Sequence, residues 1–152
     1  MIEYVAGFAF CYHETRVVLV LKKVPAWQAG LYNGVGGKIE EGESPADAMR
    51  REAIEEMGLD TKWTHFARLS GDGFAVWFYR TEITVAQGLA LYDINDVSEA
   101  IRHQEIHAVV FGGVATIPNL RWLVPMAHSS NSHDWPFDIY ERVPEAPTGE
   151  SE

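Results

Sequence analysis

The segment from Leu31 to Asp60 constrains the fold more than any other part of the chain, because a glycine-rich run leads directly into a helix with well-defined ends. Ser44 suits the N-cap, where its hydroxyl can accept a backbone hydrogen bond, and a proline follows at the first helical position. Gly58 can adopt the left-handed conformation that commonly ends a helix. These local signals predict a helix from Ser44 to Met57.

The predicted helix concentrates carboxylates on one face. Residues three and four apart are neighbours on a helix surface, and Glu52, Glu55 and Glu56 have this spacing. Such carboxylates raise one another's pKa and oppose folding unless a cation neutralises them. A solvated helix face is the ordinary alternative, but arginine interrupts this one only at two neighbouring positions. The glycine run Asn33–Lys38 would let backbone carbonyls approach a ligand, and carbonyls and carboxylates are ligands of Mg²⁺. Together the two features favour a divalent metal site, with Arg51 placed to hold Glu55.

Composition and charge restrict the function classes. With 152 residues, 47% of them hydrophobic, the chain is expected to form one globular domain over residues 1–142, followed by a Pro/Gly/Glu-rich tail at 143–152. The net charge of −10 argues against binding the backbone of DNA or RNA. A divalent metal could still bridge an acidic protein and a small phosphorylated ligand.

Cysteine usage and hydrophobic runs bear on location. Cys11 is the only cysteine, so it cannot form an intramolecular disulfide, and we expect it to pack in the core in a reducing compartment. We find no signal-peptide pattern and no apolar run long enough to span a bilayer. These observations predict a cytoplasmic protein with no membrane partner.

The remaining pattern predicts a mixed sheet with two helices, that is, an α/β or α+β sandwich. Pro118–Ser129 is the second predicted helix, and Pro125 is expected to kink it or end it early. The runs that predict strands are Glu3–Tyr12, Arg16–Lys23, Trp63–Leu69, Gly73–Thr81, His107–Phe111 and Phe137–Val143.

At this point the residues match a known pattern. The segment Gly37–Leu59 resembles the Nudix box, in which a glycine is followed after five residues by Glu and, after seven more, by Arg-Glu-aliphatic-x-Glu-Glu-x-Gly-aliphatic. Here these positions are Gly37, Glu43 and the run REAIEEMGL from Arg51, so every defining position is filled. The resemblance implies an α/β/α sandwich with a mixed sheet, which hydrolyses a nucleoside diphosphate linked to another group.

The resemblance also implies roles for individual residues. The carboxylates of Glu52, Glu55 and Glu56 would bind Mg²⁺, or Mn²⁺ as the alternative. The backbone carbonyl of Gly37 would be a further ligand. Arg51 would orient the glutamates, Glu43 would brace the loop, and Gly58 would complete the box. One carboxylate must help to deprotonate the attacking water. Family members differ on which it is, and the candidates are Glu56, Glu105 and, more weakly, Glu99.

The substrate is less constrained than the reaction. YNGVGGK is similar to the WNGFGGK of mammalian 8-oxo-dGTP hydrolases, which implies that Asn33 hydrogen-bonds a purine with Lys23 and Lys38 beside it. Asn119 matches the position of a base-reading Asn or Asp in MutT-like and mammalian members, and an amide can both donate and accept. Each asparagine also has a purely structural alternative, since Asn-Gly is a common turn and Asn is a good N-cap. Where the mammalian enzymes stack a tryptophan on the base, this chain has Ile117. Three other aromatics could stack instead: Trp122, Trp27 and Phe74.

We therefore expect a Mg²⁺-dependent nucleoside triphosphate pyrophosphohydrolase that releases a monophosphate and pyrophosphate, with an oxidised purine nucleotide such as 8-oxo-dGTP as substrate. A first alternative keeps the chemistry and changes the substrate to ADP-ribose, a dinucleoside polyphosphate or a nucleotide sugar. A second is a nucleotide-binding regulator without turnover, although the intact box argues against it. Both a monomer and a homodimer are compatible with the sequence.

Overall fold

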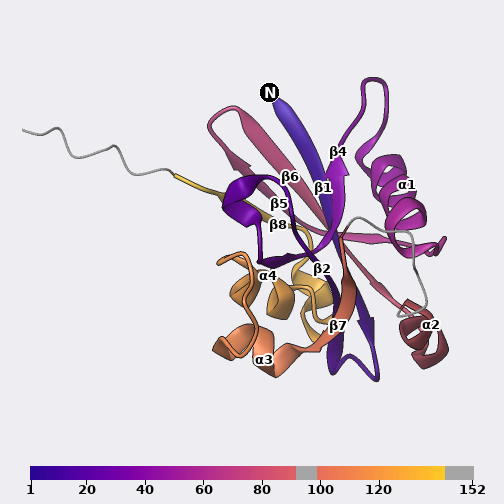
Figure 1. The fold of residues 1–152 in the computed structure, drawn as a ribbon. Coiled ribbons are helices and arrows are strands. Elements are labelled where there is room, and N and C mark those ends of the chain that lie inside the picture. Colours follow the sequence, from indigo (N-terminus) through magenta and orange to yellow (C-terminus); the bar gives the residue numbers. More distant parts are fainter. Residues whose placement is uncertain (92–98, 143–152) are drawn as a thin grey trace, which may run out of the picture.

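A computed structural model describes residues 1–91 and 99–142, and the tail predicted for residues 143–152 lies outside this part (Figure 1). Its strands are β1 (Ile2–Cys11), β2 (Arg16–Leu21), β3 (Tyr32–Asn33), β4 (Val35–Lys38), β5 (Thr64–Gly71), β6 (Phe74–Glu82), β7 (Ile101–Glu105) and β8 (Phe137–Tyr140). Its helices are α1 (Pro45–Met57), α2 (Val85–Ala90), α3 (Ile106–Phe111) and α4 (Leu120–Met126), with 3₁₀ turns at η1 (Ala26–Gln28) and η3 (Ser129–Asp134).

The strands form one mixed sheet in the order β3-β2-β1-β6-β5-β8, with β4 also paired to β1 and β7 to β2. β1 pairs with β6 in parallel and with β2 and β4 antiparallel, so it lies at the centre of the sheet. The first two predicted strands form an antiparallel hairpin, and the strand predicted at Phe137–Val143 is present as β8. β8 pairs with β5 in parallel.

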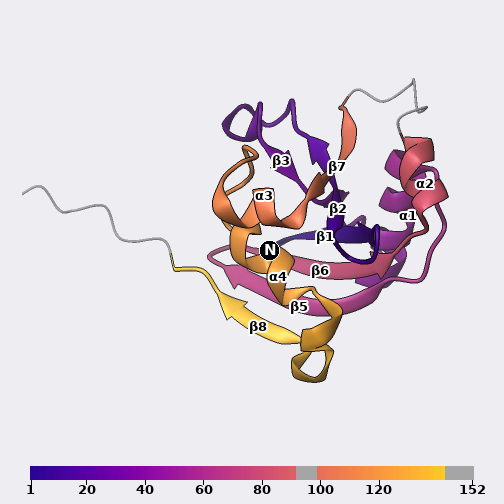
Figure 2. The ribbon, with the colours of Figure 1, turned by 90° about the horizontal axis from the view of Figure 1, so that it is seen from below.

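Alternation along β1 and β2 explains why both strands are apolar along their buried stretches. Phe8 and Phe10 face one hydrophobic core, which includes residues of α3 and α4, whereas Ala9 and Cys11 face a second core built with α1. Successive side chains of a strand point to opposite faces, so a strand covered on both sides must be apolar at every position. The sheet therefore lies between helical layers, as Figure 2 shows from below. The predicted mixed-sheet α/β sandwich is confirmed, and Cys11 is buried as expected.

Helix α1 has the ends that its sequence predicts. The Ser44 hydroxyl accepts a hydrogen bond from the Asp47 N–H at 3.1 Å, and Pro45 occupies the first helical position. Gly58 has a φ of 68°, and its N–H donates to the Ile54 carbonyl. The structure therefore confirms the helix predicted from Ser44 to Met57.

The segment predicted as a strand at His107–Phe111 is instead helix α3, and the strand of this region is β7, one segment earlier. A short apolar run such as IHAVVF fits a strand or a helix equally well, and here Gly112, with a φ of 84°, closes a helical turn. Helix α2 was not expected, although Thr84 and Gln87 form a capping box at its start. The second predicted helix ends at Met126, one residue after Pro125. No helix within residues 1–91 and 99–142 is long and apolar enough to cross a membrane.

Candidate active site

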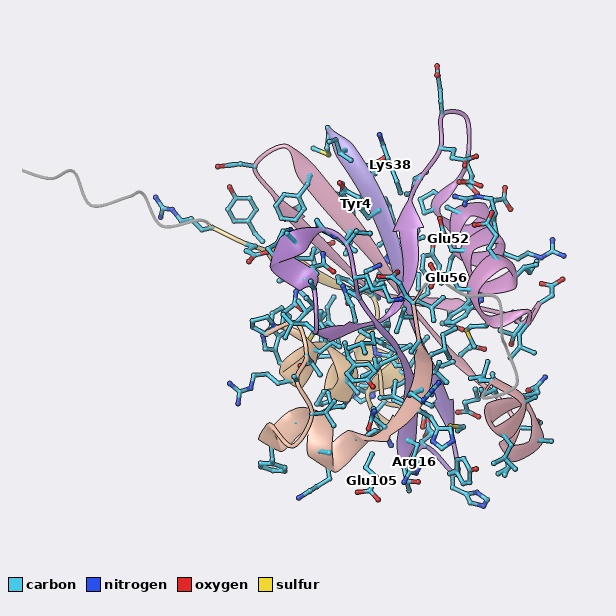
Figure 3. All side chains as sticks on the ribbon, viewed as in Figure 1. Tyr4, Arg16, Lys38, Glu52, Glu56 and Glu105 are labelled. Atoms are coloured by element: carbon cyan, nitrogen blue, oxygen red, sulfur yellow. The ribbon has the colours of Figure 1, made fainter. Side chains whose placement is uncertain are left out.

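Glu52 and Glu56 of helix α1 lie along the border between the helix and strand β4 (Figure 3). Its buried face consists of small and apolar side chains, namely Ala48, Met49, Ala53 and Met57. Glu52 lies beside this face and is only 12% exposed, and it packs directly against Gly37 of β4. A Cβ atom added to Gly37 would lie 2.5 Å from Oε1 of Glu52. The glycine is thus required for the close approach of the backbone to this carboxylate.

Arg51 connects the helix to the preceding loop through several carboxylates. Its Nε and Nη2 donate to the two oxygens of Glu43 at 2.8 and 2.9 Å, and its Nη1 donates to Glu52 at 2.9 Å. Nη1 also lies 3.5 Å from Glu55, and Nη2 donates to the Lys38 carbonyl. Hydrogen bonds from Arg51 lower the pKa of Glu43. The arginine therefore holds loop, strand and helix in one arrangement.

Glu56 is the carboxylate whose environment most opposes ionisation. Burial, followed by repulsion from Glu52, raises its pKa to about 8, and the Lys22 ammonium only partly compensates. The Glu52 carboxyl is also hydrogen-bonded to Glu56. Arg51 and Lys22 thus compensate the charge of this largely buried pair only in part. A divalent cation fits the pair, because it would replace the proton that Glu56 otherwise retains.

The three glutamates do not all converge. Glu55 has a side chain that is 57% exposed and turns toward Arg51. In the described part of the chain, no three acidic, histidine or cysteine side chains already meet around one point. The pair formed by Glu52 and Glu56, together with the carbonyl of Gly37, is therefore the arrangement closest to a metal site, and Glu55 would have to rotate to join it.

The two candidate bases outside the helix lie far apart. Glu99 accepts a hydrogen bond from Lys22 Nζ at 3.0 Å and one from the Lys23 N–H. Burial disfavours its charge, but these two donors outweigh burial and lower the pKa of Glu99. Its charge also contributes to the raised pKa of Glu56, and Lys22, its partner at 3.0 Å, acts on Glu56 as well.

Glu105 instead pairs with Arg16, at 3.5 Å, at the other end of β2. Six residues separate Arg16 from Lys22, or roughly 20 Å along an extended strand. Figure 3 shows Glu105 and Arg16 at the end of the molecule opposite Glu52 and Glu56. The structure therefore does not bring Glu105 to the carboxylates of α1, contrary to expectation.

A cavity of about 510 Å³, within the range of small-molecule sites, reaches Gly37, the residue that packs against Glu52. Its polar lining comes from Lys22, Gln28, Asn33, Lys38, Asn119 and Glu141, with backbone from Gly34, Gly36 and Gly37. Its apolar lining is Tyr4, Val5, Ala6, Pro25, Trp27, Leu69, Phe74, Val76, Phe78 and Ile117. The cavity thus joins the predicted base-reading residues to the glycine strand that touches Glu52.

Two expected lining residues are absent from this cavity. Lys23 is exposed and does not line it, whereas its neighbour Lys22 does, since adjacent residues of an extended chain point in opposite directions. Trp122 also lies outside it, while Trp27 and Phe74 are in the lining. Lys22, Gln28 and Glu141 are the polar lining residues that sequence reasoning missed. Strand alternation from Arg16 is the signal that could have distinguished the two lysines.

Both predicted base-reading asparagines line the cavity with polar groups available. Asn33 is in strand β3, paired with Val20, rather than in a turn. Its Oδ1 accepts from the Gly34 N–H at 2.8 Å, and its Nδ2 donates to Gln28 Oε1 at 3.3 Å. Asn119 stands at the N-cap of α4, but its side chain makes no capping hydrogen bond. The amide of Asn119 is therefore not used for helix capping, which was the structural alternative.

The fold, together with the carboxylate-bearing helix α1 after the glycine strand β4, is that of a known family. The model of the NUDIX domain matches residues 3–125, and the chain belongs to the Nudix family. Nudix enzymes generally use divalent metal ions and act on small nucleotide substrates. Family membership thus confirms the resemblance seen in Gly37–Leu59.

Relatives within the family differ in what they hydrolyse. The oxidized purine nucleoside triphosphate hydrolase of Mus musculus is 46% identical over 50 residues, which cover 33% of this chain and 31% of that enzyme. The ADP-ribose pyrophosphatase of Escherichia coli K12 is 32% identical over 115 residues, which cover 66% of this chain and 54% of that enzyme. This chain thus spans about half or less of the curated relatives that it matches.

Solved structures support the fold. One, from a study of MutT from Aliivibrio salmonicida and Vibrio cholerae, has a TM-score of 0.63 at 21% identity and covers 83% of this chain and 95% of that chain. At this level of identity, the match shows the shared architecture of sheet and helices.

Proposed function

We propose that the protein is a Mg²⁺-dependent pyrophosphohydrolase of purine nucleoside triphosphates, with oxidised forms such as 8-oxo-dGTP as preferred substrates. The observation that carries the proposal is the single cavity wall running from the amides of Asn33 and Asn119 to Gly37, which touches Glu52. A base bound between the amides would direct its phosphates toward the carboxylate helix. The identity of 46% with the mouse enzyme over 50 residues is consistent with this substrate class.

The roles proposed for the residues follow from their placement. Glu52 and Glu56, with the Gly37 carbonyl, would hold the cation, and Glu55 would join them after leaving Arg51. Bound there, a divalent cation would neutralise the diphosphate and lower the pKa of a bound water. Lys22 and Lys38 line the cavity, where they can pair with phosphate oxygens.

We assign to Glu99, in place of Glu105, the role of the carboxylate that helps to deprotonate the attacking water. The charge of Glu99 acts on Glu56, and hydrogen bonds keep Glu99 ionised, so it can accept a proton. With no cation bound, Glu56 keeps its proton up to about pH 8. It can therefore accept a proton from water only after a bound cation has made Glu56 ionise.

ADP-ribose is the second candidate substrate, because the similarity to the E. coli ADP-ribose pyrophosphatase extends over 115 residues. The two candidates differ in the base, adenine in one and an oxidised guanine in the other. They also differ in the second group on the diphosphate, so a substrate panel separates them.

The test is product release from a panel of 8-oxo-dGTP, dGTP, dATP, dCTP, ADP-ribose and diadenosine tetraphosphate, with Mg²⁺, for the wild type and Glu56→Gln. Pyrophosphate is measured directly, and a phosphatase converts the other products to phosphate. We expect the fastest release from 8-oxo-dGTP, with the variant losing most of it. Preferential turnover of ADP-ribose would overturn the substrate proposal, and tight nucleotide binding without turnover would favour a regulator.

A further inference from the structure

The base-reading wall of the cavity contains a residue that no motif predicts. Gln28 ends the 3₁₀ turn η1 and lines the cavity next to Asn33. Its backbone is held at both sides, because its N–H donates to the Pro25 carbonyl at 2.9 Å and its carbonyl accepts from the Leu31 N–H at 2.9 Å. The position of its side chain is thus set by a well-anchored turn.

The hydrogen bonds of the pair determine which way both amides face. The Gly34 N–H can only donate, so the atom of Asn33 that it contacts at 2.8 Å must be the oxygen. Asn33 Nδ2 therefore points to Gln28, and the Gln28 atom that accepts from it at 3.3 Å must also be an oxygen. This leaves the Nε2 amide of Gln28 without a hydrogen-bond partner among residues 1–91 and 99–142.

The free groups on this wall are mostly donors. Gln28 offers two N–H groups and the second lone pair of its oxygen, and Asn33 offers one N–H and the second lone pair of its oxygen. Three donors thus stand against two acceptor sites. An oxygen at position 6 of a purine is an acceptor, whereas the amino group of adenine is a donor. A wall rich in donors can hydrogen-bond the oxygen of a 6-oxopurine but leaves the amino group of adenine with fewer partners. A polar group left without a partner in a binding site lowers affinity strongly.

We propose that Gln28 determines base specificity: it positions the Asn33 amide and supplies N–H donors that select 6-oxopurine nucleotides over 6-aminopurine nucleotides. This inference rests on the proposed function, since it assumes that the cavity holds the base of a purine nucleotide. Gln28 acts on binding of the base and not on the phosphates. Its effect is therefore on affinity and KM rather than on kcat.

Two substitutions separate the two parts of this role. Gln28→Leu removes both the acceptor that holds Asn33 and the donors that face the cavity. Gln28→Glu keeps an acceptor for Asn33 Nδ2 and replaces the donors with a carboxylate oxygen, which accepts from an amino group. Gln104→Leu is the matched control, because Gln104 lies in β7 opposite Val17 and is not in the cavity lining.

The test measures binding of dGMP and dAMP by calorimetry, and KM and kcat for dGTP and dATP. We expect the wild type and Gln104→Leu to bind dGMP more tightly. Gln28→Leu should lower this preference by about tenfold with kcat for dGTP little changed, and Gln28→Glu should shift the preference toward dAMP. The carboxylate of Gln28→Glu could repel the phosphate of either nucleotide, but it would do so equally for dGMP and dAMP. The ratio of the two affinities is therefore unaffected by this repulsion.

The outcomes distinguish the two proposals. A wild type that binds both monophosphates equally, or a Gln28→Leu variant that behaves like Gln104→Leu, would overturn the role of Gln28. A wild type that selects dGMP and loses this preference in Gln28→Leu, but hydrolyses no nucleoside triphosphate, would support the role of Gln28 and overturn the proposed activity.

Discussion

Arg51 donates two parallel hydrogen bonds to Glu43, from Nε to Oε2 at 2.8 Å and from Nη2 to Oε1 at 2.9 Å. The planar fork of an arginine matches a carboxylate in this way, and lysine cannot reproduce it. Because Nη1 of the same guanidinium reaches Glu52 at 2.9 Å, the geometry of the loop is transmitted directly to the carboxylate cluster. The neighbouring Arg50 makes an equally close pair with Asp60, but at an exposed surface.

These two adjacent arginines allow a matched comparison. Arg51→Lys should weaken metal affinity by about 10- to 100-fold and lower kcat/KM, because residues that orient metal ligands have effects of this size. Arg50→Lys should leave both unchanged. Titration calorimetry with Mg²⁺ or Mn²⁺ and steady-state kinetics measure the effects. Equal losses in the two variants would show that Arg51 acts only through general helix stability.

A second comparison concerns the two carboxylates near β7. Glu99→Gln should reduce kcat by about 100-fold or more, the range associated with a general base, while Glu105→Gln should leave kcat unchanged. Glu105 pairs with Arg16 at the far end of β2, so it serves as the control. The pH profile of kcat provides the second readout, since a base should remove one limb of the profile. An inactive Glu105→Gln variant that remains folded would contradict the placement of the site.

The stability of the metal-free protein should depend on pH through Glu56. Burial and Glu52 raise its pKa from 4.5 to about 8 in the folded protein. Between these values the unfolded chain has lost the proton that the folded protein keeps, so stability falls as pH rises from about 4.5 to about 8, where the folded carboxyl also ionises. In a chain of this size, 1 kcal/mol moves Tm by roughly 2–4 °C, so we expect a fall of several degrees.

Thermal unfolding in a chelator across this pH range measures the effect. Glu56→Gln should flatten the dependence, whereas Glu55→Gln should retain it because Glu55 is exposed and faces Arg51. Saturating Mg²⁺ should reduce the slope in the wild type. A wild-type Tm that rises steadily with pH under chelation would refute the raised pKa.

Features with local causes were predictable from the sequence. The ends of α1 follow from Ser44, Pro45 and Gly58, each of which acts within one turn of its own position. The burial of β1 and β2 on both faces follows in the same way from their nearly continuous apolar composition. The prediction of a strand at His107–Phe111 was wrong, because nothing within that short run distinguishes a helix from a strand.

The ranking of the site residues depended on contacts between distant segments. The sequence ranked Glu105 above Glu99 as a candidate base. The pairing of β7 with β2 reverses this order, because it places Glu99 beside Lys22 and Glu105 beside Arg16. The hydrogen bond from Asn33 to Gln28 likewise depends on the fold of the η1 turn. Motif spacing contains no information about either relationship.

The last prediction concerns the close contact between Gly37 and Glu52. Gly37→Ala would place a Cβ atom 2.5 Å from Oε1 and 2.8 Å from the carboxyl carbon of Glu52. The carboxylate must therefore move, and we expect metal affinity to fall by about 10- to 100-fold. Calorimetry with Mn²⁺ and kcat/KM for the best nucleotide substrate measure this loss.

Gly88→Ala is the control for replacing a glycine as such. A Cβ atom on Gly88 would meet Cys11 Sγ at 3.6 Å, an ordinary contact, and Gly88 lies within helix α2. Alanine in a helix is favoured over glycine by roughly 0.5–1 kcal/mol, so Tm should rise slightly while activity stays unchanged. If Gly37→Ala kept full metal affinity while remaining folded, the carboxylate of Glu52 would not be a ligand in its present position, and the metal site would have to be sought around Glu55 and Glu56 instead.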